Sequence, residues 1–153
     1  MTSTEVVDLI KKGKTYARRT KYREALVYFE KALTLDPRSA EARCMRAAAL
    51  LETGNNAEAL ADSEKAIQID QNYAEAWSKK GLALYNLERF KEAIDACTRA
   101  LALNANDASA WYVKGVCLDE MGRTGEAEIA YAKSLELEII TDIEAEKKKA
   151  GKK

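Results

Sequence analysis

Basic side chains gather in one stretch near the N-terminus, IKKGKTYARRTKY at residues 10 to 22. The stretch holds six Lys or Arg residues and no acidic residue. Such a cluster can bind the phosphates of a nucleic acid, the headgroups of an anionic membrane or the carboxylates of an acidic partner. Which of these chemistries applies depends on which side chains share one surface, and therefore on the fold.

Histidine, on which many catalytic sites depend, is missing. The chain has no His, which removes Ser-His-Asp and Cys-His catalysis and metal sites built on His. Cys44, Cys97 and Cys117 show no C-x-x-C spacing, and such isolated thiols are typical of small buried side chains in a reducing compartment. Acid pairs such as Asp119-Glu120 fit a solvated helix surface as well as a reacting group. We therefore expect no enzyme activity, no cofactor and no bound metal.

Composition favours a single all-helical domain. The 153 residues carry 25 basic and 25 acidic side chains, so the chain as a whole is not a polycation for nucleic acid or anionic lipid. Hydrophobic residues make up 47%, and there is a single Pro, as in helical proteins. No run of about eighteen apolar residues is present, and the first residues do not resemble a secretion signal. We expect a cytoplasmic protein that does not bind membranes.

The sequence repeats itself with a period of 34 residues. AEAWSKKGLALY at 74–85 matches ASAWYVKGVCLD at 108–119, and AEARCMRAAALL at 40–51 lies one period earlier. Four units follow without gaps, at residues 6–39, 40–73, 74–107 and 108–141. Residues 142–153 follow the last unit.

Each unit reads as two helices joined by a turn. Small residues recur at three fixed places, where they let neighbouring helices approach closely. They are Gly13, Ala47, Gly81 and Gly115; Ala25, Ala59, Ala93 and Ala127; and Ala32, Ala66, Ala100 and Ser134. Turn residues such as Gly54-Asn55-Asn56 break each unit midway, and residues such as Asp36-Pro37 separate the units. The sequence thus predicts a short α-solenoid over residues 1–141.

These residues resemble the tetratricopeptide repeat family. The third unit carries the pattern in Trp77, Gly81, Ala93, Ala100 and Leu103, and the fourth in Trp111, Gly115, Ala127 and Tyr131. The first two units depart from it, with Leu9 and Arg43 at the Trp place. The resemblance implies a right-handed superhelix of four repeats that acts as a non-catalytic protein–protein interaction scaffold. A basic row at Lys12, Arg46, Lys80 and Lys114 is expected to cover apolar surface with its aliphatic stems.

In the family, the first helices of the units line a concave wall on which peptides bind. When the inward-facing positions of the family are matched to this sequence, the wall is basic at its N-terminal end, apolar in its middle and acidic at its far end. The predicted contacts are Lys11, Lys14, Arg18, Met45, Lys79, Leu82, Tyr85, Asn86, Tyr112 and Val113. We therefore expect a protein or peptide ligand with an acidic end and an apolar middle.

One specialisation of the family binds the acidic tail of heat-shock chaperones with a clamp of two Lys, two Asn and one Arg. The corresponding places here hold Ile10, Lys14, Met45, Glu75 and Lys79. No Asn is present, and Glu75 repels a carboxylate where the clamp needs Lys. The sequence therefore disfavours that ligand.

The end of the fourth unit lacks the polar break of the other three. Leu135, Ile139, Ile140 and Ile143 continue an apolar stripe at helical spacing. Three interpretations stay open: the stripe pairs with another copy in a homo-oligomer, it packs against further domains of a longer protein, or Ile140 and Ile143 fold back as a short cap. Residues 142–153 are predicted to hold a helical extension and a disordered Lys-rich tail.

The basic stretch itself splits once the helical frame is applied. Only Lys11, Lys14 and Arg18 point towards the concave wall, whereas Arg19 and Lys21 belong to a turn. RNA binding by the first unit is the weaker alternative, because the second and fourth units carry net negative charge and no row of aromatic residues accompanies the cations. The basic end of a protein-binding groove is the preferred interpretation.

Overall fold

The computed structural model describes residues 2–152, and these residues form eight α-helices and no strand. Successive helices form pairs, each made of a first helix and a second helix joined by a turn. The helices are α1 (Thr2–Arg18), α2 (Tyr22–Leu35), α3 (Ala40–Glu52), α4 (Asn56–Ile69), α5 (Ala74–Asn86), α6 (Phe90–Leu103), α7 (Ala108–Glu120) and α8 (Thr124–Gly151).

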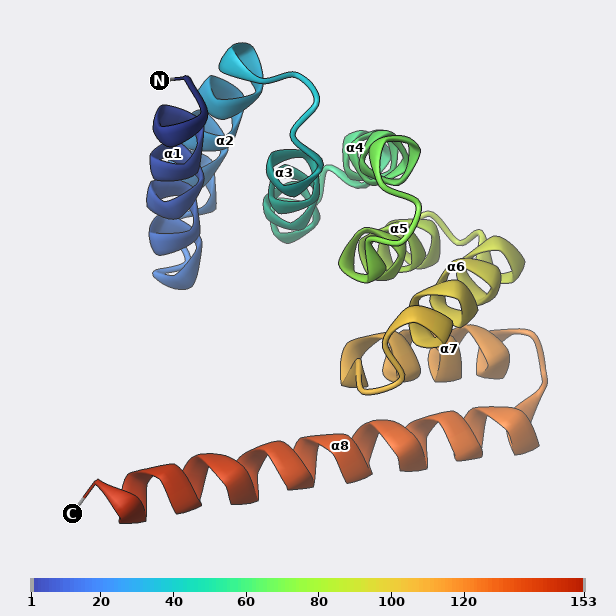
Figure 1. The fold of residues 1–153 in the computed structure, drawn as a ribbon. Coiled ribbons are helices and arrows are strands. Elements are labelled where there is room, and N and C mark those ends of the chain that lie inside the picture. The colour runs from blue at the N-terminus through green and yellow to red at the C-terminus, as the bar shows by residue number, and fades with distance from the viewer. Residues whose placement is uncertain (1, 153) are drawn as a thin grey trace.

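The helix pairs form an arc (Figure 1). Helices α1, α3, α5 and α7 lie along its inner side, and α2, α4 and α6 lie along its outer side. Each helix packs against the next one in sequence, and α1 with α3, α3 with α5, and α5 with α7 also contact each other. First helices therefore form most of the inner wall, as the family resemblance implies.

The turn within each pair repeats the same backbone conformation. A left-handed residue occurs every 34 residues, at Thr20, Gly54, Glu88 and Gly122, with φ of 59°, 81°, 59° and 76°. Glycine adopts this conformation without strain, whereas Thr20 and Glu88 each carry a cost of about 1 kcal/mol. The turn geometry is thus kept even where the sequence lacks Gly.

The turns between pairs are held by short polar side chains. Oδ1 of Asp36, Asp70 and Asn104 accepts a hydrogen bond from the backbone N–H two residues later, at 3.1, 3.0 and 3.1 Å. Ser39 and Asp107 then cap α3 and α7 by accepting from the N–H groups of Ala42 and Ala110. These bonds stabilise the turn after each of the three helices and, at Ser39 and Asp107, the start of the next helix.

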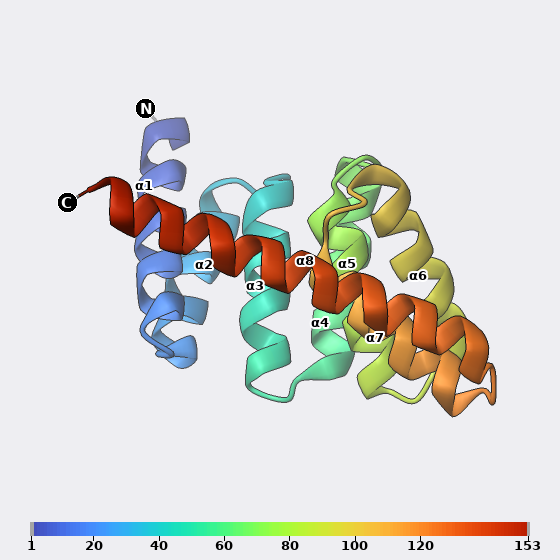
Figure 2. The same ribbon diagram turned by 90° about the horizontal axis from the view of Figure 1, so that it is seen from below.

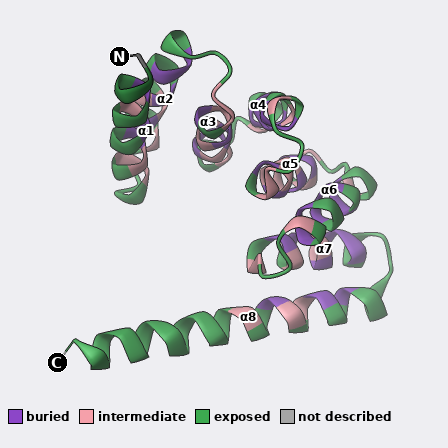
Figure 3. Ribbon diagram, in the orientation of Figure 1, coloured by how far each residue is buried: buried purple, intermediate pink, exposed green. Residues whose placement is uncertain are grey.

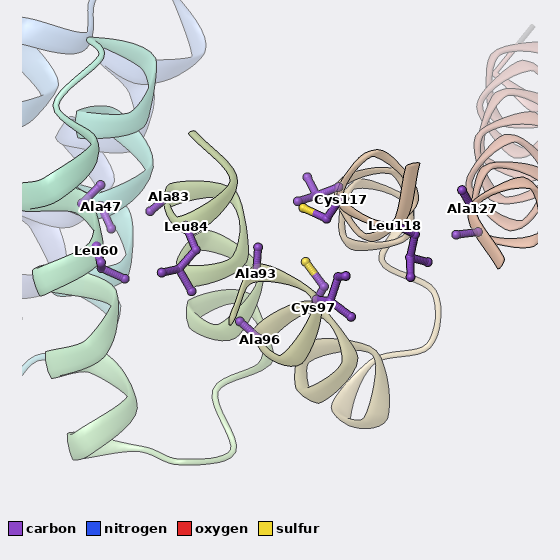
Figure 4. Close-up of a cluster of buried hydrophobic side chains, with 14 of the residues drawn as sticks. Ala47, Leu60, Ala83, Leu84, Ala93, Ala96, Cys97, Cys117, Leu118 and Ala127 are labelled. Atoms are coloured by element: carbon purple, nitrogen blue, oxygen red, sulfur yellow. The ribbon is translucent and has the colours of Figure 1, made fainter. Parts of the chain in front are cut away.

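Small side chains and thiols fill the space between helices (Figure 4). Where one helix carries Gly, its neighbour inserts a larger side chain: a Cβ at Gly13 would meet the Phe29 ring, and one at Gly115 would lie 2.8 Å from the Tyr131 ring. In the second pair Ala47 takes the Gly place, and Ser63 takes the place of Phe29. From the first pair to the second, one side chain becomes larger and the side chain facing it becomes smaller, so the helices stay closely packed.

Gly13→Ala is expected to lower the free energy of unfolding by about 1 to 2 kcal/mol. The added methyl overpacks against the buried Phe29 ring, which outweighs the gain of about 1 kcal/mol in helix propensity. Urea denaturation followed by circular dichroism measures the change. Gly125→Ala is the matched control, because its Cβ meets nothing within 4 Å on helix α8, and it is expected to be neutral or stabilising. A stabilised Gly13→Ala protein would show that the close approach is not required.

Arg43 replaces the Trp of the third and fourth units by making the same contact. Trp77 Nε1 donates to the carbonyl of Gln71 and Trp111 Nε1 to that of Ala105, both at 2.9 Å. Arg43 Nη2 donates to the carbonyl of Pro37 at 3.3 Å, one period earlier. The guanidinium thus supplies the hydrogen bond of the missing indole.

Three members of the predicted basic row contact neighbouring side chains of the helix pairs. The Nζ atoms of Lys80 and Lys114 lie 5.4 and 5.7 Å from the ring centres of Trp77 and Trp111. Arg46 instead binds Asp62, with Nε–Oδ2 and Nη2–Oδ1 distances of 2.5 and 2.7 Å. These contacts agree with a structural role for the row.

Helix α8 differs from the other second helices by its length. It continues as helix to Gly151, whereas the composition predicts a disordered Lys-rich tail within residues 142–153. Ala, Glu and Lys are strong helix formers, and Glu144 and Lys148 stand at i and i+4, which favours the helix. Figure 3 shows that the half of α8 beyond α7 is exposed throughout. Over residues 2–152, no helix combines the length and the apolar character that a membrane span requires.

Candidate functional site

A cavity of about 260 Å³ opens on the inner side of the arc, near its N-terminal end. Four helices contribute its walls: α1, α2, α3 and α5. The lining residues are Lys14, Ala17, Arg18, Tyr22, Phe29, Met45, Ala48, Ala49, Leu51, Glu52, Lys79 and Leu82. We call this cavity the concave pocket.

Apolar side chains form most of the concave pocket. The buried Phe29 and Ala49 contribute to its lining, and Met45, Leu51 and Leu82 line it as partly buried side chains. Met has an unbranched, flexible side chain that adapts to differently shaped partners. The pocket can therefore accept branched aliphatic side chains of a ligand.

Charged side chains line the pocket beside this apolar surface. Lys14 forms an ion pair with Glu41 across the contact between α1 and α3, so part of its charge is already neutralised. Arg18 and Lys79 form no ion pair within residues 2–152. Glu52 is the one acidic residue of the lining. The cations best placed to receive a ligand carboxylate are therefore Arg18 and Lys79.

The pocket brings together five of the ten residues that the sequence predicts for the groove: Lys14, Arg18, Met45, Lys79 and Leu82. Lys11 is exposed on α1 but lies outside the pocket lining. Tyr85 and Asn86 line a second, more polar cavity further along the inner wall, with Glu88, Phe90 and Glu120. Asn86 also donates a hydrogen bond to Asn56 at the start of α4, at 3.0 Å.

The two predicted contacts on α7 behave differently from each other. Tyr112 is 55% exposed, and its ring centre lies 5.8 Å from that of Tyr131. Val113 is only 5% exposed and packs in the core cluster that also contains Leu84, so it is not a groove residue as predicted. Its place faces the contact between α5 and α7, where a β-branched side chain fills core space.

Sequence reasoning missed Tyr22 and Phe29, which reach the pocket from the second helix α2. Asn56 and Phe90 stand at the place of Tyr22 in the second and third units, and both contact a first helix. Asn56 bonds Asn86, and the ring of Phe90 lies 6.2 Å from that of Tyr85. The first residue of a second helix therefore reaches the last turn of a first helix.

The three thiols contribute to the core and not to a reactive site. Cys44, Cys97 and Cys117 are free and fully buried. Burial raises the pKa of Cys44 and of Cys97 to about 12, and that of Cys117 to about 11. The thiols therefore stay protonated at neutral pH, where the thiolate is the reactive form.

Stacked helix pairs with an inner wall of first helices define an α-solenoid, a class of protein-interaction scaffold. Three models described as tetratricopeptide repeat match residues 10–76, 74–107 and 96–129, and together they span residues 10–129. The chain belongs to the tetratricopeptide repeat family. Among curated proteins, no relative matches it.

Solved structures show the same fold. The crystal structure of MamA is 27% identical with a TM-score of 0.76, and the match covers 90% of this chain and 80% of that one. The first TPR of Spaghetti (RPAP3), bound to the HSP90 peptide SRMEEVD, is 27% identical with a TM-score of 0.75, over 78% of this chain and 95% of that one. A thermophilic TPR protein of Thermus thermophilus, TTC0263, shares the fold at 22% identity with a TM-score of 0.79, over 87% of this chain and 74% of that one. The first two relatives, together with the family, support a protein-interaction scaffold.

Proposed function

We propose that this protein is a non-catalytic scaffold whose concave pocket binds a segment of a partner protein, with Leu, Ile or Met side chains beside Asp or Glu. The apolar side chains of the segment enter between Met45, Leu51 and Leu82. Its carboxylates bind Arg18 and Lys79. Tyr85, Asn86 and Tyr112 extend the same inner wall towards the C-terminal helices.

The observation that carries this proposal is the pairing of an apolar cavity with cations that have no ion-pair partner within residues 2–152. A soluble domain rarely leaves an apolar concavity of this size on its surface unless a ligand uses it. Arg and Lys at its edge give the site a preference for acidic segments. Lys14 contributes less, because it must release Glu41 to bind a ligand.

The acidic tail that RPAP3 binds is not the preferred ligand. In this chain Ile10 is buried and Glu75 is exposed, and both stand at places where the tail-binding members of the family have polar or basic clamp residues. Glu75 repels the clustered carboxylates of a peptide such as SRMEEVD. We expect this peptide to bind at least about tenfold more weakly than a segment with alternating acidic and aliphatic residues.

Selection of displayed 16-residue peptides by the full-length protein tests the proposal. We expect enrichment of sequences with two or more Leu, Ile or Met residues and at least two acids, together with discrimination against SRMEEVD. The selected peptides are expected to compete with one another for one site. Enrichment of basic peptides, or no enrichment above a random pool, would contradict the proposal.

A further inference from the structure

The half of α8 beyond α7 has an apolar face with nothing packed on it. Ile139, Ile140 and Ile143 are 50%, 44% and 46% exposed, and Leu135 is 57% exposed. Among the described helices only α7 packs against α8, and Figures 1 and 2 show the remainder extending across the open side of the arc. Exposed aliphatic residues at helical spacing mark a surface that is covered in the working assembly. We call residues 135–146 the α8 stripe segment.

The α8 stripe segment is acidic as well as apolar. It contains Glu136, Glu138, Asp142, Glu144 and Glu146, and no Lys or Arg. Glu136 stands four residues before Ile140, and Glu146 stands three residues after Ile143, so both acids share the face of the isoleucines. The segment thus has the chemistry that the concave pocket accepts: aliphatic side chains flanked by carboxylates.

We propose that the α8 stripe segment of one copy occupies the concave pocket of a second copy. This inference rests on the proposed function, since it supplies the pocket with a particular ligand. Ile140 and Ile143 enter beside Met45 and Leu82, and the flanking acids of α8 bind Arg18 and Lys79. If both copies exchange their segments, the result is a closed dimer; if one does, copies add head to tail.

Two other arrangements fit the observations less well. The segment does not reach the pocket of its own chain, because α8 is one continuous helix and lies against α7 alone. Two α8 helices that pair with each other bring the acids beside both stripes together, which is repulsive. The pocket, in contrast, offers cations where the stripe offers acids.

Sedimentation velocity on the full-length protein at about 100 µM tests the proposal with two double variants. The helix variant carries Ile140→Ser and Ile143→Ser, and the pocket variant carries Arg18→Glu and Lys79→Glu. All four residues lie at the surface or line the pocket, and circular dichroism checks that both variants keep the fold. We expect the unchanged protein to self-associate, and each variant to associate at least about 30-fold more weakly.

An equimolar mixture of the two variants gives the sharpest result. The pocket variant retains an intact stripe and the helix variant retains an intact pocket, so we expect the mixture to form a one-to-one complex. A pocket variant that associates as strongly as the unchanged protein overturns the inference in favour of pairing between α8 helices. A mixture that stays monomeric, or an unchanged protein that is monomeric at this concentration, also overturns it. Either failure leaves the proposed function standing if selected peptides still bind the pocket.

Discussion

Asp62→Ala is expected to lower the free energy of unfolding by about 3 to 5 kcal/mol, because it leaves two guanidinium groups without their counter-charge. Asp62 lies on α4 and is only 3% exposed. Its Oδ1 accepts from Arg43 at 3.3 Å, and both of its oxygens accept from Arg46 at 2.5 and 2.7 Å. This one change therefore affects two partly buried charges at once.

The loss is expected to be recovered in part in the double variant Arg43→Trp with Asp62→Ala, in which Arg46 has lost its counter-charge but can lie over the new indole as Lys80 lies over Trp77. The third and fourth units already use this solution, with Trp77 near Ala96 and Trp111 near Ala130 at the equivalent places. An indole at position 43 refills the space and can bond the same backbone carbonyl. The pair Arg43 and Asp62 is therefore a local substitute for Trp and Ala.

Urea denaturation followed by circular dichroism compares these variants with Asp95→Ala. Asp95 is an exposed acid on α6, so its replacement is expected to change stability by less than about 0.5 kcal/mol. If Asp62→Ala is as stable as Asp95→Ala, then the ion pairs on α4 do not stabilise the fold.

The double variant Arg18→Glu with Lys79→Glu is expected to bind the selected acidic peptides about 100-fold more weakly at low salt, a loss of about 2.7 kcal/mol. Each reversal removes one attraction to a carboxylate and adds one repulsion. The two side chains project from α1 and α5, on opposite walls of the concave pocket. Isothermal titration calorimetry with one selected peptide measures the difference.

Two controls distinguish direct contacts in the pocket from the effect of the protein's net charge: a second variant of equal charge and a change of salt concentration. Lys65→Glu with Lys91→Glu changes the net charge equally, but on second helices and outside the pocket, and is expected to alter the affinity less than about threefold. Raising the salt concentration is expected to weaken binding to the unchanged protein more than binding to the pocket variant. Equal losses in the two double variants would mean that net charge, and not the pocket, selects the ligand.

The helix pairs could be predicted from the sequence because their causes are local and repeated. Turn residues recur at Gly54 and Gly122, and small residues recur wherever two backbones approach. Comparison of the units also shows how one substitution compensates another: where Ala47 replaces the Gly of other units, the smaller Ser63 stands at the place of Phe29. Four copies of one pattern therefore give more information than any one of them.

The pocket could be predicted only in part. Helical spacing gives the direction of a side chain but not how deeply it is covered, which is why Val113 is buried and Lys11 lies outside the pocket lining. The ion pair of Lys14 with Glu41 depends on how α1 is rotated against α3, and no local pattern contains that angle. The prediction of a disordered tail is wrong over residues 142–151, because the charges there suggest disorder while the Ala, Glu and Lys residues favour helix.

Methyl resonances of methionine offer the most direct test of the pocket. The chain has three Met residues, of which Met45 lines the concave pocket and Met121 follows α7 outside it. On titration of the 13C-methyl-labelled full-length protein with a selected peptide, we predict that the Met45 resonance shifts and saturates while that of Met121 stays in place. The variant Met45→Leu assigns the signal. A Met45 resonance that remains fixed while the peptide is bound would contradict the account.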